Sequence, residues 1–370
     1  MSLSKPPQFR IRFAQPIMGE PELQAVQRVL SSGFLTNGPE TAAFEEEFAR
    51  VHAVPYAVAM ANGTVALTAM LLAHGIGPGD EVIVPSFTFL STATAVVHAG
   101  ARPVFAEVHA DILNIDADHV AALITARTKA VIAVHYAGQA ADMAELRALT
   151  DRAGILLLED AAEAHGASYR GRPVGGLADG AMFSFTPTKN ITMGEGGMVT
   201  THDPDYARRL RQLRNHGVAD DGTPRTSIGY NWRMTEMQAA IGRVQVTRLS
   251  AIIERKQANA EFLAAHLRDA DVLFPPNRPD RTATYMMLTL RSSTRRDAIV
   301  QGLRDRGIEA RVYFPPAHLD AVFAADNVTL PRTEEVANTV FSIPCHAELT
   351  EDDLALIAKE ITALAPRDAT

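Results

Sequence analysis

The chain contains a single cysteine among its 370 residues. This lone residue, Cys345, excludes an internal disulfide framework and a metal cluster held by several thiolates. It lies in the apolar run SIPCHAEL, which is typical of a buried small hydrophobic residue rather than of a nucleophile. The histidines show no metal-ligand spacing, so we expect no metal site.

Positive charge and long apolar runs are also lacking. The net charge of -8, with no basic stripe, argues against a nucleic-acid partner. The N-terminal stretch MSLSKPPQFRIRF has no apolar signal core, and no run is long enough to span a bilayer. We therefore expect a cytoplasmic protein without a membrane partner. With 47% hydrophobic and 21% charged residues, the chain has the composition of a globular protein long enough for two domains.

Apolar strand-like runs alternate with helical segments after residue 55. The strands are expected at Tyr56–Met60, Glu81–Pro85, Arg102–Ala106, Lys129–Val134 and Ile155–Glu159, and the helices near 64–73, 90–99, 117–124 and 142–153. This alternation predicts parallel β-α units whose sheet is covered on both faces. Ligands of such sheets bind at the carboxyl ends of the strands. The residues directly after each strand are therefore candidate site residues.

The stretch AMFSFTPTKNITMGEGGMVT, residues 181–200, has the strongest functional pattern. Two apolar strands, Ala181–Phe185 and Gly197–Thr200, enclose a loop of small residues that carries Lys189. A lysine on such a loop is partly desolvated, which makes its amine a usable nucleophile. A solvated loop lysine is the alternative, and other parts of the chain argue against it.

Three other strand ends carry candidate ligand groups. Asn62-Gly63-Thr64 opens a helix directly after a strand, which suits a phosphate, although Asn62 and Thr64 could simply be helix caps. Phe89 follows the second strand and could stack on a flat cofactor or belong to the core. Asp160 ends an apolar strand, where an acid needs a cationic partner such as a pyridinium nitrogen; the alternative is a helix cap.

The C-terminal part of the chain predicts a smaller unit. Thr235-Glu236-Met237-Gln238 matches a capping box and opens a long amphipathic helix, with a second helix expected to follow to about residue 270. A break comes at Leu273–Pro276. A strand near 284–290, a helix near 295–306 and a final helix capped at Thr350 follow. We expect a large domain with a helical N-terminal lead over residues 1–255 and a small α+β domain over 256–370.

Several motifs together resemble the sugar aminotransferase family of pyridoxal 5'-phosphate (PLP) enzymes, the DegT/StrS type. They are LTNGPE, GIGPGDEVIVPSFTF, EDAAEAHGA, SFTPTKN with GEGG, LRNHG, GYNWRMTE with QAAIG, and RVYFPP. Each motif alone is weak, but their order and spacing are specific and cover nearly the whole chain. The resemblance implies fold type I: a large domain with a mainly parallel sheet flanked by helices, plus a smaller C-terminal α+β domain.

The resemblance also implies roles for residues at the matching positions. Lys189 would form the Schiff base with PLP, and Asp160 would pair with the pyridinium nitrogen. The other cofactor contacts implied are Gly63, Thr64 and Ser184 at the phosphate, Phe89 on the ring face, and position 163 at the ring hydroxyl. That position is commonly glutamine, but here it is Glu163, whose carboxylate would repel a phenolate unless it were protonated.

The family builds each site from two subunits of a homodimer. Asn231 and Arg233, in the GYNWRMTE segment, are therefore candidates for phosphate or carboxylate contacts in the partner's site. Thr36, Tyr313 and His318 are candidate sugar contacts, although each could equally serve ordinary loop packing.

The activity implied is transfer of an amino group from glutamate or glutamine to a keto sugar, in amino-sugar biosynthesis. TKN followed by GEGG looks similar to relatives that act on 4-keto-6-deoxy nucleotide sugars, such as perosamine synthases. A keto-cyclitol (inosose) aminotransferase is the enzymatic alternative. A non-catalytic PLP-binding regulator is a further alternative, but it would show a damaged lysine or an added DNA-binding domain. Relatives with histidine in place of the lysine are dehydratases, and Lys189 argues against that activity.

Overall fold

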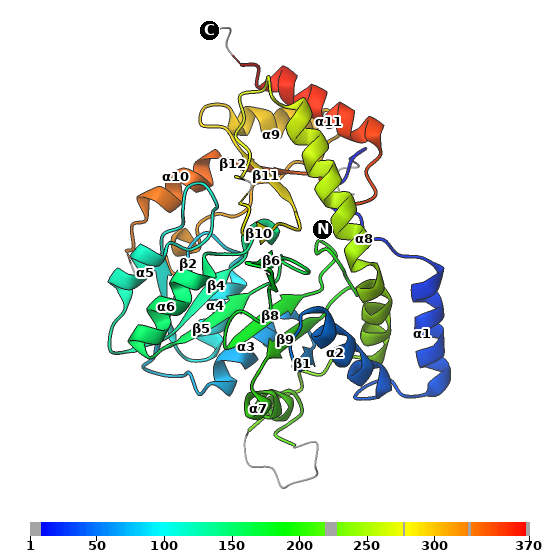
Figure 1. Cartoon of the computed structure of the whole chain (residues 1–370), viewed down its shortest axis with the longest axis vertical. Coiled ribbons are helices and arrows are strands. Elements are labelled where there is room, and N and C mark those ends of the chain that lie inside the picture. Colours follow the sequence, from blue (N-terminus) through cyan, green and yellow to red (C-terminus); the bar gives the residue numbers. More distant parts are fainter. Residues whose placement is uncertain (1–8, 219–227, 277, 325–326, 368–370) are drawn as a thin grey trace, which may run out of the picture.

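A seven-stranded sheet forms the centre of the larger part of the molecule (Figure 1). The computed structural model describes residues 9–218, 228–276, 278–324 and 327–367. The strands follow the order β1-β9-β8-β5-β4-β2-β3. Their bounds are β1 Tyr56–Met60, β2 Glu81–Pro85, β3 Arg102–Ala106, β4 Thr128–Val134, β5 Leu156–Asp160, β8 Gly180–Ser184 and β9 Gly197–Thr201.

Most strands of this sheet run parallel to their neighbours. Only β9 is antiparallel, pairing with β1 on one side and β8 on the other. The strands are largely apolar because helices cover both faces of the sheet. The predicted fold class is confirmed. Each strand predicted for this sheet begins and ends within one residue of the observed strand.

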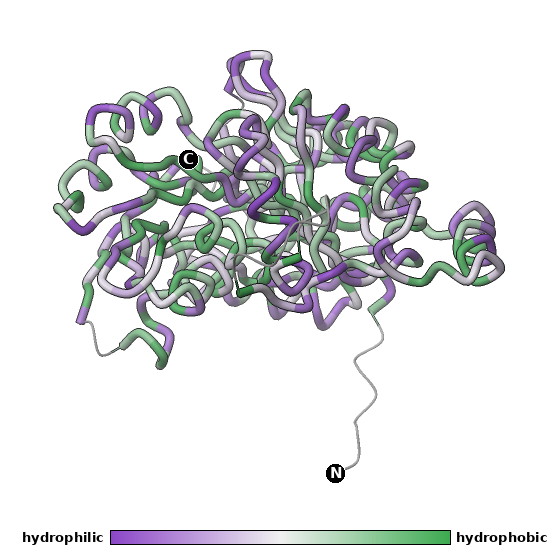
Figure 2. Tube along the Cα trace, turned by 90° about the horizontal axis from the view of Figure 1, so that it is seen from below, coloured by the Kyte–Doolittle hydropathy of each residue, from purple (hydrophilic) through white to green (hydrophobic). Residues whose placement is uncertain are grey.

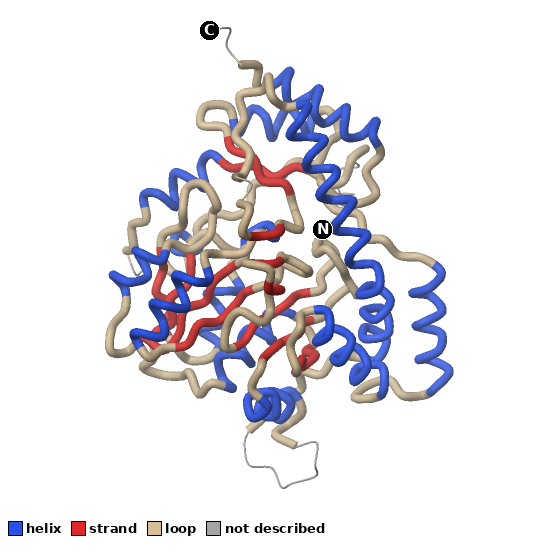
Figure 3. The backbone as a smooth tube through the Cα atoms, viewed as in Figure 1, coloured by secondary structure: helices blue, strands red, loops and turns tan. Residues whose placement is uncertain are grey.

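Two apolar cores lie against the sheet, which Figure 3 shows in red among the blue helices. One core is formed with α2 (Pro39–Val51), α5 (Ala117–Leu123), α6 (Met143–Ala153) and the first half of α8 (Glu236–His266). The other is formed with α3 (Gly63–Ala73), α4 (Ser91–His98) and α7 (Pro204–Arg214). Because helices pack against both faces of the sheet, close packing holds the side chains at the strand ends in place.

A third core belongs to the C-terminal part of the chain. It is formed with the second half of α8, β11 (Leu288–Arg291), β12 (Val340–Ile343), α9 (Arg296–Asp305) and α11 (Glu351–Leu364). β11 and β12 pair as an antiparallel ribbon. The remaining elements are α10 (Pro331–Thr339), the short strands β6 (Ser168–Tyr169), β7 (Arg172–Pro173) and β10 (Arg281–Thr282), and the 3-10 turns Tyr136–Gly138 and Ala317–Leu319.

The long helix α8 connects the two parts (Figure 1). Its N-terminus has the predicted capping box, with Thr235 and Gln238 bonded to each other. The expected pair of helices is wrong: α8 is continuous from Glu236 to His266, because no proline or glycine interrupts it after Gly242. The domain division at 255/256 falls inside this helix and stays a prediction. None of the helices in the described ranges combines the length and apolar character that a membrane span needs.

Helix α1 (Glu20–Ser32) stands at the edge of the molecule, at the right of Figures 1 and 2. It packs on α8 through Ala25 and Val29. In Figure 2 the helix carries both green and purple turns. Leu23, Leu30 and the following Phe34 are 63%, 59% and 63% exposed. This edge therefore presents a cluster of large apolar side chains to solvent.

Candidate active site

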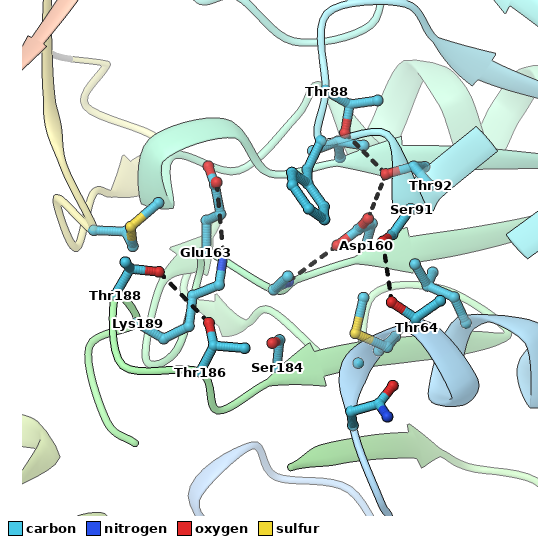
Figure 4. Close-up of a pocket in the computed structure, with 18 of the residues that line it drawn as sticks. Thr64, Thr88, Ser91, Thr92, Asp160, Glu163, Ser184, Thr186, Thr188 and Lys189 are labelled. Atoms are coloured by element: carbon cyan, nitrogen blue, oxygen red, sulfur yellow. Dashed lines mark hydrogen bonds and ion pairs between the residues drawn. The ribbon is translucent and has the colours of Figure 1, made fainter. Parts of the chain in front are cut away.

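Side chains from several strand ends line one cavity of about 620 Å³. They come from the carboxyl ends of β1, β2, β5 and β8 and from the loop that follows β8, and Figure 4 shows them facing one another. Eight residues predicted from the sequence line it: Gly63, Thr64, Phe89, Asp160, Glu163, Ser184, Lys189 and Tyr313. Parallel strands bring such distant residues to the same edge of a sheet.

The N-terminus of α3 forms one end of the cavity. Asn62 caps the helix, its Oδ1 accepting a hydrogen bond from Val65 N at 3.0 Å, as one of the two interpretations of this residue predicts. Gly63 lies so close to β8 that a Cβ there would be 2.9 Å from Ser184 Cβ. The Thr64 hydroxyl lies 3.0 Å from that of Ser91. Hydroxyls and the helix N-terminus thus surround a space that suits a phosphate.

Asp160 lies on the cavity wall and is 6% exposed. Its Oδ2 accepts a hydrogen bond from Thr92 Oγ1 at 2.8 Å, and its Oδ1 accepts one from Ala162 N at 3.1 Å. Burial raises the pKa of this carboxyl, while these hydrogen bonds and Lys189 lower it less. No ion pair to Asp160 is found in the described part of the chain. A cationic ring nitrogen would supply a charge partner.

Lys189 and Glu163 form an ion pair on the wall of the cavity (Figure 4). Lys189 Nζ is 3.7 Å from Glu163 Oε1, and the lysine side chain is 13% exposed. Glu163 Oε2 accepts a hydrogen bond from Ala137 N at 2.7 Å. Burial raises the pKa of Glu163, against the opposing effect of Lys189. A carboxyl with a raised pKa is more readily protonated and can then donate a hydrogen bond.

The mouth of the cavity is aromatic. Phe89 is 60% exposed, and its ring meets that of Phe314 at a centroid distance of 5.9 Å. Phe13 and Tyr313 line the same cavity with an edge-to-face contact at 5.5 Å. Arg311 lies over the Phe13 ring and donates a hydrogen bond to Tyr313 Oη. Since that oxygen accepts from Arg311, the Tyr313 proton is free to bond to a ligand.

Four predicted site residues do not line this cavity: Thr36, Asn231, Arg233 and His318. Thr36 is exposed and bridges to Thr235. Arg233 donates a hydrogen bond to Asn215 Oδ1 at 2.8 Å, and Asn231 forms a β-bridge to the same residue.

His318 is buried and bonded on both ring nitrogens, to the Ser86 hydroxyl at 2.6 Å and to Glu334 Oε1 at 3.3 Å. This arrangement favours the packing interpretation of the residue. Among the described residues, no cluster of three or more His, Cys, Asp or Glu side chains could hold a metal ion.

Other lining residues were missed by the sequence analysis. Thr88 lies 2.8 Å from Thr92, so the two hydroxyls form a chain that ends at Asp160. The hydroxyl residues that follow the second strand could have been predicted as site residues. That strand, β2, runs parallel to β5 and ends at the same edge of the sheet. Phe13 offered no signal, because it precedes the first helix and lies in no predicted helix or strand.

Comparison with known proteins gives a family match over most of the chain. The model of the DegT/DnrJ/EryC1/StrS aminotransferase family matches residues 16–362. DesV from S. venezuelae, solved in complex with a ketimine intermediate, is 39% identical, with 94% of this chain and 95% of that chain covered and a TM-score of 0.90.

Two further proteins of known structure resemble the chain. The aminotransferase TlmJ from Streptoalloteichus hindustanus is 34% identical, with coverages of 95% and 98% and a TM-score of 0.91. Spr1654 from Streptococcus pneumoniae is 26% identical, with a TM-score of 0.92 in both its PLP form and its PMP form. Coverage is 96% of this chain in both forms, and 98% and 97% of those chains.

Proposed function

Because the chain belongs to the DegT/DnrJ/EryC1/StrS aminotransferase family, whose enzymes depend on PLP, we propose that it aminates a 4-keto-6-deoxy nucleotide sugar in amino-sugar biosynthesis. The amino donor is glutamate or glutamine. The observation that carries the proposal is the convergence of Lys189, Asp160 and the N-terminus of α3 on one cavity.

The cavity residues fit PLP. Gly63, Thr64 and Ser184 would hold the phosphate, because the missing Cβ of Gly63 leaves room beside the helix N-terminus. Asp160 would hold a proton on the ring nitrogen. Phe89 would cover the ring face. The bound cofactor supplies an electron sink for the carbanion that forms when the donor loses its α-proton.

Two side chains handle protons in this proposal. Lys189 Nζ would anchor the cofactor until the amine of the donor displaces it, and as a free amine it would then remove the α-proton of the donor amino acid. Glu163 occupies the position that is glutamine in many relatives. Burial raises the pKa of this carboxyl. A protonated Glu163 would donate a hydrogen bond to the ring oxygen as a glutamine amide does.

The mouth of the cavity supports a deoxy sugar. Phe13, Met286, Tyr313 and Phe314 line the cavity, and their largely apolar surfaces suit a methyl group better than a hydroxymethyl group. Tyr313 Oη keeps one donor for a sugar oxygen. A keto-cyclitol has no such methyl group, so the aromatic mouth favours the deoxy sugar over that alternative.

The proposed substrates carry negative charges, and the residues that line the cavity supply too few positive charges to pair with them. Among its lining residues Lys189 is the one cation, yet the donor carboxylate and a nucleotide diphosphate are both anionic. Arg233 and Asn231 lie outside this cavity, near the exposed Ile228 and Tyr230. We infer a homodimer in which the segment 228–235 of one subunit reaches the cavity of the other. The exposed apolar side chains of α1 and Phe34 support a covered face.

Single half-reactions test the proposal. Purified protein loaded with PLP is mixed with glutamate and, separately, with glutamine, and the absorbance of the lysine-linked cofactor is followed. We expect one donor to bleach the band and a 4-keto-6-deoxy nucleotide sugar to restore it. Restoration by a keto-cyclitol or a 3-keto sugar alone would replace the proposed substrate. A band that no donor bleaches would favour the non-catalytic regulator.

A further inference from the structure

Lysine is rare in this chain. The sequence contains five lysines, at positions 5, 129, 189, 256 and 359, against thirty arginines. Lys129 and Lys359 are exposed. The other two in the described ranges, Lys189 and Lys256, line the same small cavity of about 20 Å³ behind the site, together with Asn190 and Met286. The two lysines of the described ranges that are not exposed therefore lie at one location, in a chain whose positive charge comes mainly from arginine.

Lys256 lies on α8 and is 4% exposed. Its Nζ donates hydrogen bonds to Asn190 Oδ1 at 2.7 Å and to the carbonyl oxygen of Met286 at 3.2 Å. Within the described residues it has no ion pair. Burial lowers its pKa to about 8. An ammonium without a carboxylate partner is costly to bury, so its presence here is not explained by stability.

The two acceptors of Lys256 belong to different parts of the molecule. Asn190 directly follows Lys189 in the chain, and its Nδ2 also donates to the carbonyl of Thr284 at 3.3 Å. Met286 lines the main cavity and precedes β11 of the C-terminal part. One ammonium therefore joins the long helix, the lysine loop and the segment that leads into β11. A compact ammonium can reach both oxygens at this depth, whereas a planar guanidinium is larger and rigid.

We propose that Lys256 is a positioning residue for the transamination: through Asn190 it holds the Lys189 loop at the working distance from the cofactor. This proposal rests on the proposed function. Lys256 contacts neither cofactor nor substrate in this role. It acts by fixing the backbone next to Lys189 relative to α8 and to the segment that carries Met286.

Lys256→Met tests the proposal, because methionine has a similar length without the charge. Replacing a buried charged group by an apolar one of similar volume is often neutral or stabilising. We therefore expect the melting temperature of the cofactor-free variant to stay equal or rise. The rate constant of the first half-reaction should fall at least about tenfold, and PLP should attach to Lys189 more slowly, as shown by borohydride trapping and peptide mapping. Lys129→Met, at an exposed position, is the matched control and should change neither the rate constant nor the rate of PLP attachment.

A purely structural role gives the opposite pattern. If Lys256→Met lowers the melting temperature but leaves the rate constant and the trapping rate unchanged per folded molecule, the proposal is overturned. Should this variant not fold, Asn190→Ala removes the same hydrogen bond and should slow both steps by a similar factor. Normal trapping and turnover in Asn190→Ala would overturn the proposal as well.

The double variant adds a second criterion. If Lys256 acts through Asn190, the double variant should be no slower than the slower single variant. Multiplicative effects would mean that the two residues act separately, against the proposal. A wild-type chain that traps no PLP at Lys189 would instead refute the proposed function, so the two failures are distinguishable.

Discussion

The inner end of the cavity and its mouth differ in how completely one chain builds them. At the inner end, Asp160, Ser184 and Gly63 lie on or beside buried strands, and two hydrogen bonds hold the Asp160 carboxylate in place. At the mouth, Phe89 is 60% exposed. Asn231 and Arg233, which are predicted to make phosphate or carboxylate contacts in a partner's site, do not line this cavity. The inner end is therefore built by the sheet of one chain, whereas we propose that a second subunit completes the mouth.

Removing the central lysine should have the largest effect. Lys189→Ala should lose the lysine-linked absorbance band and lower turnover by at least about 1000-fold, because no other amine lines the described cavity. Absorbance spectra and steady-state rates check this, with Lys129→Ala as the control. Normal turnover would refute the assignment of the inner end.

Mixed dimers test whether the mouth is shared. Asn231→Ala and Lys189→Ala should each be inactive alone. After mixing and reassociation, one of the two sites in each hybrid should be intact, so that separated hybrids should regain roughly half of the wild-type activity per dimer. Activity assays on separated hybrids measure this. If hybrids form but stay inactive, each chain builds its own mouth, and the comparison between the two ends fails.

Asp160→Asn should weaken the inner end without unfolding it. The amide keeps the shape but no longer favours a proton on the ring nitrogen, so the first half-reaction should slow by about 100-fold. Stopped-flow absorbance gives the rate, and circular dichroism checks the fold. Asp269→Asn, at an exposed position, serves as the control. Equal rates for Asp160→Asn and wild type would remove the proposed role.

Tyr313→Phe should affect the mouth alone. Loss of one hydrogen bond to a sugar oxygen costs about 1 kcal/mol, which corresponds to a roughly fivefold weaker apparent affinity for the keto sugar. The first half-reaction with the amino-acid donor should keep its wild-type rate. A slower first half-reaction would place Tyr313 at the inner end and contradict the proposed division.

Glu163→Gln should change the pH dependence of stability in the cofactor-free chain. Because burial raises the folded-state pKa of Glu163, it contributes stability at low pH that is lost as pH rises from 4.5 through the raised value. The variant lacks this loss, so its melting temperature relative to that of the wild type should increase over that window, by roughly 1–2 °C for each kcal/mol in a chain of 370 residues.

Differential scanning calorimetry at acidic and at neutral pH measures this relative melting temperature. Glu348→Gln, at an exposed position, is the matched control. If the melting temperatures of Glu163→Gln and wild type change by the same amount with pH, the Glu163 carboxyl does not titrate as proposed.

The sequence by itself determined the strands of the large sheet and predicted which residues lie at the inner end. Apolar runs of five to seven residues between turns are local signals, and strand ends in a parallel sheet follow a general binding rule. Lys189, Asp160 and Gly63 could therefore be selected from their positions relative to the strands. The motifs added the family, which the match over residues 16–362 confirms.

Tertiary structure alone decided which distant side chains meet. The contact of Lys256 with Asn190 spans 66 positions, and no periodicity encodes it. The Thr88–Thr92–Asp160 chain and the place of Phe13 at the mouth likewise depend on how helices and the N-terminal segment pack. Local patterns specify elements because backbone geometry is local. Burial, close approach and the pKa values of Glu163 and Lys256 arise only when the packed layers exclude water.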